Sequence, residues 1–184
     1  FVDMELCQLD PVYLRDLNSY NKIVNQRNRL LKDMAFQPEL SGTLDIWDMQ
    51  LAGYAKRIIE RRSIFAQELN GIIQEVHASL SGGKEKLEVV YEPHVNAEEV
   101  EERMQKNRER DIRMKQTTTG PHRDDFAFAA NGIDIRRFGS QGQQRTAALS
   151  LKLSEIELVK RMTKDAPVLL LDDVLSELDH RRQE

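Results

Sequence analysis

The stretch "RRFGSQGQQRTAALSLKLSEIELVK", from Arg136 to Lys160, changes character after its first residues. It opens with glycine, serine and amide residues and continues as a long helical pattern, in which Leu149, Leu153 and Ile156 share one face. The amino end of an α-helix has unsatisfied N–H groups and a partial positive charge. The stretch therefore predicts a helix whose beginning can bind an anion such as phosphate.

Several small or amide residues could contribute to such a site. Ser140 offers a hydroxyl, and Gly139 and Gly142 allow the backbone to approach a ligand closely. Gln141 and Gln143 add uncharged amide donors. The helix dipole alone contributes only about 0.3–1 kcal/mol, so several donors must act together. The alternative is an ordinary serine N-cap with the glutamines on the surface.

A second motif, "VLLLDD", follows that helix at residues 168–173. Its apolar run is typical of a strand buried on both faces, and Asp172 and Asp173 follow at the carboxyl end, where α/β sheets bind ligands. Mg²⁺ is often held by one or two carboxylates together with water and phosphate oxygens. The pair thus indicates a metal–phosphate site, and the alternative is a solvated acidic turn.

The first half of the chain is predicted to be helical. Asp10 and Pro11 are typical of a helix start, and a heptad-like apolar stripe follows up to Met34. A second helix is expected from Asp45, with Asp48 completing a capping box, and it continues to about Ser79. Two long stripes joined by a short polar break predict an antiparallel helical hairpin, an arm.

The second half is predicted to be α/β. "KLEVVYEP" reads as a strand, Asn96 with Glu99 as the start of a helix to about Lys115, and "FAFAANGIDIRRF" as a β-hairpin turning at 131–132. "LSGGK", at residues 80–84, is expected to be a turn because a strand, not a helix, follows it. The expected domains are a helical arm at 1–80 and an α/β part at 81–184.

The basic residues of the first half could form a phosphate-binding face. Acidic residues lie between them, so an ordinary solvated helix surface is the favoured alternative. The candidates are Lys22, Arg27, Arg29, Lys32, Lys56, Arg57, Arg61 and Arg62.

The loop "TTTGPHRDD" contains two further candidates, His122 and Arg123. They could contact DNA or nucleotide, or only brace the neighbouring hairpin. The formal charge of -4 argues weakly against wholesale nucleic-acid binding. Cys7 is the single cysteine, which fits a reducing cytoplasm, and no apolar run is long enough to span a membrane.

The order of these motifs resembles part of an ABC-type ATPase head. "GSQGQ" is similar to a signature motif, "VLLLDD" to Walker B and "SELD" to a D-loop. Together with "TTTGPHRDD" and the opening "FVDMELCQLDPVYL", they resemble the bacterial RecF family, relatives of the SMC-class ATPases. The resemblance covers the whole chain and implies an ABC-type lobe carrying an inserted helical-hairpin arm, α+β overall.

The resemblance also implies roles for individual residues. Ser140, Gln141, Gly142 and Gln143 would contact the γ-phosphate of ATP bound to a second subunit. In the Walker B and D-loop motifs, Asp172 would hold Mg²⁺ and Asp173 would orient the attacking water, while Ser176 and Asp179 would communicate across the dimer. Asp173 stands where most ABC ATPases have glutamate, which fits slow hydrolysis.

The family's cofactors are ATP and Mg²⁺, and its expected partners are DNA gaps or junctions, RecR-like and RecO-like proteins and a second copy formed on ATP binding. The implied processes are replication, recombinational repair and the SOS response. The phosphate loop G-x-x-x-x-G-K-[ST] does not occur in the sequence. The chain alone is therefore expected to be inactive as an ATPase, whereas a protein that also carries the loop should be a weak one.

Two alternatives remain. The chain could be a non-catalytic arm module that binds DNA or a partner protein. It could also belong to another SMC-like ATPase, of the chromosome-organising or RecN-like kind, although those usually carry much longer coiled coils.

Overall fold

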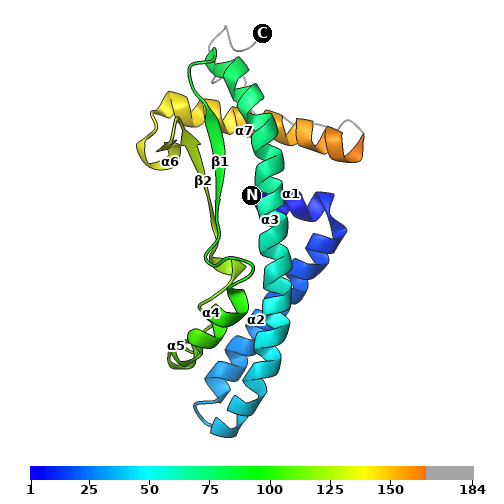
Figure 1. Cartoon of the computed structure of the whole chain (residues 1–184), viewed down its shortest axis with the longest axis vertical. Coiled ribbons are helices and arrows are strands. Elements are labelled where there is room, and N and C mark those ends of the chain that lie inside the picture. Colours follow the sequence, from blue (N-terminus) through cyan, green and yellow to red (C-terminus); the bar gives the residue numbers. More distant parts are fainter. Residues whose placement is uncertain (165–184) are drawn as a thin grey trace. The chain divides into compact units, whose positions relative to one another are not determined.

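The computed structural model describes residues 1–164, which form long helices and a small sheet (Figure 1). The elements are α1 (Val2–Leu9), α2 (Pro11–Asp33), η1 (Pro38–Thr43), α3 (Leu44–Ser81), β1 (Leu87–Glu92), α4 (Val100–Lys106), α5 (Arg108–Met114), η2 (Pro121–Arg123), β2 (Asp125–Ala130), β3 (Ile133–Asp134), α6 (Ile135–Phe138) and α7 (Gln141–Thr163). The expected α+β composition is confirmed. No helix among residues 1–164 is both long and apolar enough to cross a membrane.

These residues group into two compact units. The first contains residues 1–65 and 91–126, and the second contains residues 66–90 and those from 127 onward. Helix α3 and strands β1 and β2 contribute residues to both units. The division into an arm at 1–80 and an α/β part at 81–184 stays a prediction.

The start of α2 shows why the chain becomes helical there. The Asp10 side chain accepts hydrogen bonds from the N–H groups of Val12 and Tyr13, each at 3.0 Å. Pro11 occupies the first helical position, where no N–H is needed. Both features were predicted from the sequence, and the structure confirms them.

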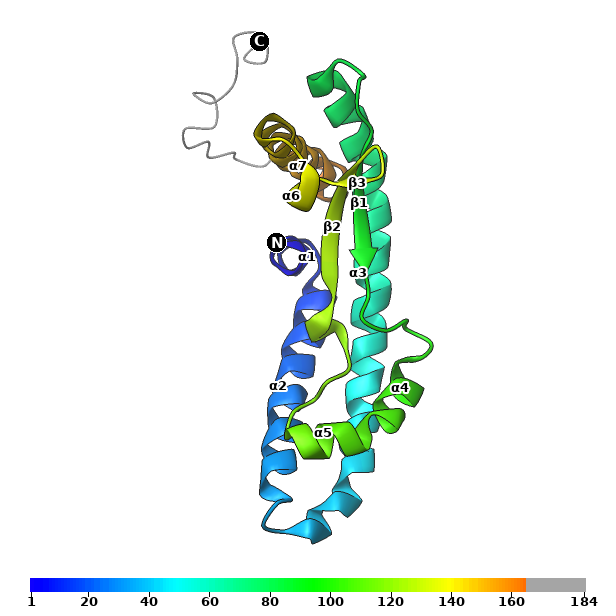
Figure 2. The ribbon, with the colours of Figure 1, turned by 90° about the vertical axis from the view of Figure 1, so that its left-hand side faces the viewer.

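In the first unit, α2 and the amino-terminal part of α3 run antiparallel, joined through η1 (Figure 2). Asp10, at the start of α2, pairs with Arg61, and Asp16, further along α2, pairs with Arg57, which comes earlier in α3. This opposite order of the partners is that of two antiparallel helices. The predicted helical hairpin is thus confirmed within this unit. Its apolar interior contains Tyr13, Tyr20, Ile23, Leu31, Leu51, Ile58 and Phe65.

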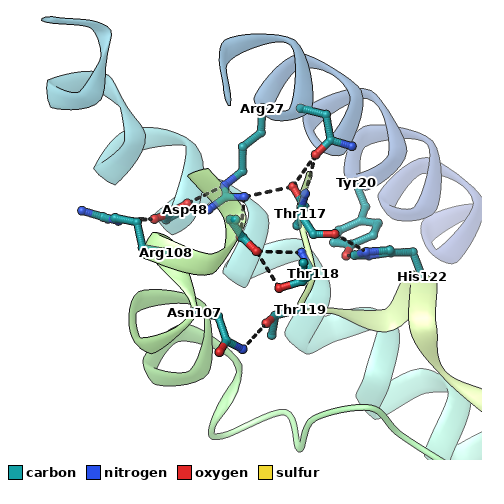
Figure 3. Close-up of polar contacts among 11 residues, drawn as sticks. Tyr20, Arg27, Asp48, Asn107, Arg108, Thr117, Thr118, Thr119 and His122 are labelled. Atoms are coloured by element: carbon teal, nitrogen blue, oxygen red, sulfur yellow. Dashed lines mark hydrogen bonds and ion pairs between the residues drawn. The ribbon is translucent and has the colours of Figure 1, made fainter. Parts of the chain in front are cut away.

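Arg27 lies within this interior and has no exposed side-chain surface. Its Nε donates to Asp48 Oδ1 and its Nη1 to Asp111 Oδ2, both at 2.7 Å, and Nη1 also donates to Thr117 Oγ1 at 3.0 Å (Figure 3). Arg108 of α5 adds a second cation to Asp48. A buried charge is tolerated when it is paired and hydrogen-bonded in this way, so the network joins α2, α3 and α5.

Two sequence predictions fail at this network. Asp48 does not complete a capping box, because its carboxylate is bound by Arg27 and Arg108 instead. The single helix expected up to Lys115 is divided into α4 and α5 at Asn107, whose amide donates to Thr119. At Asp48 tertiary hydrogen bonds take the place of the local one that the sequence pattern favoured, whereas at Asn107 the backbone bonds to Arg103 and Asp111 are kept.

The second unit contains the β-hairpin. Asn131 and Gly132 have φ values of 51° and 80°, as a type I′ turn requires, and Ala130 pairs with Ile133 across it. The sheet has the order β1-β2-β3. The second strand of the hairpin is shorter than expected, because Ile135–Phe138 form the short helix α6. "LSGGK" closes α3 and enters a turn, as predicted, with Gly82 and Gly83 at positive φ.

The buried face of α7 is more polar than the sequence suggested. Leu149 is buried, but Leu153 and Ile156 are only partly so. The fully buried hydroxyls of Ser150 and Ser154 donate to the carbonyl four residues earlier, at 2.7 and 2.6 Å. These internal bonds satisfy polar groups that would otherwise be costly to bury, and they leave a face of small side chains.

Replacing Arg27 with alanine should lower the free energy of unfolding by about 3–5 kcal/mol, because Asp111 would stay buried without its cation. Urea denaturation measures this change. Lys56→Ala is the control, since Lys56 lies 3.9 Å from Glu60 on an exposed face and its loss should cost about 0–1 kcal/mol. Equal stability of the two variants would contradict the buried-network interpretation.

Candidate functional site: the amino end of α7

The amino end of α7 is the first candidate site. Ser140 is its N-cap: its Oγ accepts from the N–H of Gln143 at 3.2 Å, and its own N–H donates to Gln143 Oε1 at 2.9 Å. This reciprocal pair is a capping box. Ser140, Gln141 and Gly142 are exposed and Gln143 is half-buried, so the predicted anion-binding turn lies at the surface.

The two glycines of this turn have different uses. A Cβ on Gly139 would lie 2.6 Å from the carbonyl oxygen of Ile135, so glycine is required there for close packing against α6. Gly142 has only Ser140 Oγ near such a position, at 4.0 Å. Neither has a positive φ, so glycine is not required in this turn for its backbone torsions. The open space beside Gly142 does leave the backbone accessible to a ligand.

A pocket of about 270 Å³ lies beside this turn. It is lined by Ser81, Lys84, Glu85, Ser140, Gly142, Gln143 and Thr146. The Lys84 ammonium and the first N–H groups of α7 suit an anion such as a phosphate. The Glu85 carboxylate opposes anion binding because it is negatively charged. Its Oε1 accepts from Gln143 Nε2 at 2.7 Å.

The other predicted nucleotide-site residues are not described by the structure. Asp172, Asp173, Ser176 and Asp179 lie outside residues 1–164. Within the described part of the chain, no group of three or more histidine, cysteine or carboxylate side chains could hold a metal ion. The expected Mg²⁺ site therefore stays a prediction.

The loop at residues 117–124 is the second candidate region, and it is tightly held within the first unit. Arg62 of α3 donates to the carbonyl oxygen of Pro121 at 2.7 Å and to Asp124 Oδ2 at 2.8 Å. Burial opposes the charged form of Arg62, but Tyr13, Asp3 and Asp124 raise its pKa above the ordinary value. Arg62 therefore stays charged and fixes the loop from one side, while Arg27 binds Thr117 from the other.

Both ring nitrogens of His122 are used inside this loop. Nε2 donates to the carbonyl oxygen of Thr117 at 3.1 Å, which leaves Nδ1 to accept from the Tyr20 hydroxyl at 2.6 Å (Figure 3). His122 is exposed as a whole residue, but desolvation of its ring in this loop lowers its pKa, which keeps the ring neutral as this arrangement requires. Burial, with Asp124 adding to it, raises the pKa of Tyr20, so the phenol keeps its proton. A DNA or nucleotide contact by His122 stays a prediction, and Arg123 is exposed.

The basic residues considered as one phosphate-binding face do not form one. Arg27 and Arg62 are buried in ion-pair networks, and Arg57 and Arg61 bind Asp16 and Asp10. Four exposed cations do follow one another along α2, at intervals of three or seven residues. They are Arg15, Lys22, Arg29 and Lys32.

The buried polar residues Asp111, Thr117 and His77 were not among the candidates drawn from the sequence. Each comes from a segment that reads as loop or helix surface, and its burial depends on partners far away in the chain. The one available signal was the position of Arg27 in the middle of an apolar stripe.

A helical hairpin combined with an α/β part in which a Gly-Ser-Gln-Gly turn opens a long helix defines the class: an ABC-type ATPase head with an inserted arm. The chain superposes with a TM-score of 0.91 on a solved structure of the recombination mediator protein RecF with ATP, in the RecFOR pathway. The two are 39% identical, and the match covers 98% of this chain and 51% of the other. A structure of RecF with ATPrS gives a TM-score of 0.90.

The sequences of curated proteins show the same similarity to RecF. The chain is 58% identical over 183 residues to the DNA replication and repair protein RecF of Agathobacter rectalis, and 57% identical over 183 residues to that of Lachnoclostridium phytofermentans. Each match covers 100% of this chain and 51% of the relative. No family model matches. The chain is thus similar over its whole length to RecF proteins, and it spans about half the length of the curated relatives it matches.

Replacing Gly120 with alanine should destabilise the protein by about 2 kcal/mol or more, because its φ of 136° is a region nearly restricted to glycine. A Cβ there would also lie 2.2 Å from the Tyr20 hydroxyl. Thermal and urea unfolding measure the loss. Gly53→Ala is the control, since no atom lies within 4 Å and alanine should stabilise helix α3 by about 1 kcal/mol. Equal effects would argue against a constrained loop.

The stability contributed by His122 should depend on pH. Its pKa is lower in the folded protein than the ordinary 6.5, so the unfolded chain binds the proton first as the pH falls. This contribution is therefore complete above about pH 6.5 and is lost at more acidic values. Unfolding free energies between pH 7 and pH 5 should fall more steeply for the parent than for His122→Asn, and parallel profiles would refute this.

Proposed function

We propose that this chain is part of a protein that binds ATP and DNA and acts in DNA replication and recombinational repair, in the RecFOR pathway. The observation that carries the proposal is the exposed, capped amino end of α7 in a chain superposable on RecF with ATP. A helix start with accessible N–H groups is suited to binding the terminal phosphate of a nucleotide.

In this proposal the first turn of α7 contacts ATP held by a second copy of the protein. The backbone of Gly142 and the side chains of Ser140 and Gln143 would surround the γ-phosphate, with Gln141 at the rim. Asp172 would hold Mg²⁺, which neutralises phosphate charge when bound, and Asp173 would orient the attacking water. Ser176 and Asp179 would transmit the dimer contact, and hydrolysis, which should be slow, would separate the copies.

DNA and RecR-like and RecO-like proteins are the proposed partners, acting at gaps or junctions. The exposed cations of α2, such as Lys22 and Arg29, form a surface of suitable charge for a phosphate backbone. This surface also supports the second candidate, an arm whose purpose is binding rather than catalysis. A truncated protein with only residues 1–126, which keeps the partners of Arg27 and Arg62, would favour that candidate if it still bound DNA. The proposed location is the cytoplasm.

Ser140→Arg should abolish ATP-dependent dimerisation of the whole protein that contains this chain, because a long side chain would fill the phosphate pocket. ATP binding within one subunit should persist, since the site acts on the partner's nucleotide. Sedimentation with and without ATP measures the first effect, and fluorescence binding of an ATP analogue measures the second.

Two variants serve as controls. Ser140→Ala removes the cap and one proposed phosphate contact without blocking the pocket, so it should cost about 1 kcal/mol of stability and weaken ATP-dependent dimerisation without abolishing it. Ser41→Arg places the same side chain on the exposed η1. If the Ser140→Arg protein still dimerises with ATP as the parent does, the trans-phosphate role is wrong.

A further inference from the structure

The exposed side of α2 carries cations and amides but no carboxylate over most of its length. Between Leu14 and Lys32 the one acidic residue is Asp16, which is buried and bound by Arg57. At 3.6 residues per turn, the exposed polar residues of this stretch lie within a band about 140° wide on the helix surface. They form the basic face of α2: Arg15, Asn18, Asn21, Lys22, Asn25, Gln26, Arg29 and Lys32.

The four cations of the basic face have no carboxylate partner among residues 1–164. Each cation of α3, by contrast, pairs with a carboxylate, as Lys56 does with Glu60 and Arg62 with Asp124. Unpaired like charges on one face repel one another until an anion neutralises them, so the basic face suits an anionic partner. The formal charge of -4 of the whole chain opposes this only weakly, since salt screens charges more than about 10 Å away.

The spacing of the basic face fits a long, regular anion. Arg15, Lys22 and Arg29 follow one another at seven-residue intervals, about 10.5 Å along the helix, and the row extends over about 26 Å to Lys32. A hollow of about 450 Å³ lies on this face, and it is lined by Lys22, Asn25, Gln26 and Arg29. DNA phosphates accept hydrogen bonds from both cationic and amide side chains, and the hollow offers both kinds of donor.

We propose that the basic face of α2 binds the phosphate backbone of duplex DNA, independently of base sequence. This inference rests on the proposed function and specifies the surface and the form of DNA. Proteins that bind single strands stack the bases on exposed aromatic side chains. No residue of the basic face is aromatic, and Tyr13 and Tyr20 of α2 are buried. A duplex needs no such stacking, because its backbone presents phosphates along the whole row.

An acidic protein is the competing partner for this face. Interfaces between proteins usually have an apolar or aromatic centre that is surrounded by polar residues. From Arg15 to Lys32, no exposed residue of α2 is apolar, so the basic face lacks such a centre. Interfaces with DNA are more polar and more positively charged, which is the composition found here.

The test measures the affinity of the whole protein that contains this chain for a fluorescent DNA duplex, with ATP, at several salt concentrations. In the double variant Lys22→Gln/Arg29→Gln, two cations are removed, whereas glutamine keeps the helix propensity almost unchanged. The dissociation constant should rise about tenfold at physiological salt, and the slope of log affinity against log salt should become shallower by about 2. The loss should be equal for duplexes of different sequence, and the parent should bind a single strand of the same length more weakly.

Lys56→Gln/Lys106→Gln is the matched control, because it removes the same charge from exposed ion pairs on α3 and α4 of the same unit. It should bind the duplex as the parent does, and thermal melting shows that each variant is folded. Parent-like affinity and salt slope in Lys22→Gln/Arg29→Gln overturn the inference and leave an acidic protein as the partner of this face. An equal loss in the control, or a preference of the parent for single strands, also overturns it.

The proposed function can fail or survive separately. If the parent binds duplex DNA with ATP and the Lys22→Gln/Arg29→Gln protein binds it equally well, only the assignment of the surface is wrong. If the parent binds no DNA, the proposed function fails and the inference fails with it. The Ser140→Arg experiment tests the nucleotide site without involving α2.

Discussion

The first unit depends on two buried guanidinium groups. Arg27 and Arg62 lie inside a helical hairpin, where an unpaired charge would be very costly. Arg27 pairs with Asp48 within the hairpin and Arg62 with Asp3 of α1, and the other partners are carboxylates, a hydroxyl and a carbonyl oxygen of α5 and of the loop at 117–124. Several of these bonds form only when those distant segments are in place. These bonds give the loop, which has three threonines and one glycine, a defined conformation.

In the second unit, the main requirement lies at the beginning of α7, where backbone N–H groups need hydrogen-bond acceptors. A helix start must satisfy its first N–H groups, and the capping box of Ser140 and Gln143 does so without filling the turn. The same two residues are the proposed phosphate ligands, and Gln143 caps through its Oε1 while its Nε2 donates to Glu85.

The sequence predicted the elements whose signals are local. The Asp10–Pro11 start, the Asn131–Gly132 turn and the serine cap at 140 depend on neighbouring residues, and all are found in the structure. The predictions failed where a distant partner decides. Asp48 had the spacing of a capping residue, but two arginines bind it.

The same contrast between local signals and distant partners holds for the candidate site. The exposed turn at 140–143 could be found from its residue types, since glycine, serine and amides before a helix have a direct physical meaning. The contacts of Glu85 and His77 with α7 could not, because the turn after α3 and the end of that helix meet α7 only in three dimensions. A single phosphate-binding face was the less favoured interpretation of the eight basic residues, and burial or ion pairing of Arg27, Arg57, Arg61 and Arg62 rules it out.

The ion pairs along the hairpin limit how the chain can change in length. A single residue inserted into α2 would rotate everything beyond it by about 100° and move Arg27 away from Asp48. Insertions and deletions should therefore be tolerated at the polar connection around 35–43, or as matched additions of about seven residues in both helices. Among relatives, hairpins of this kind are expected to differ in length by about seven residues in each helix rather than by single residues.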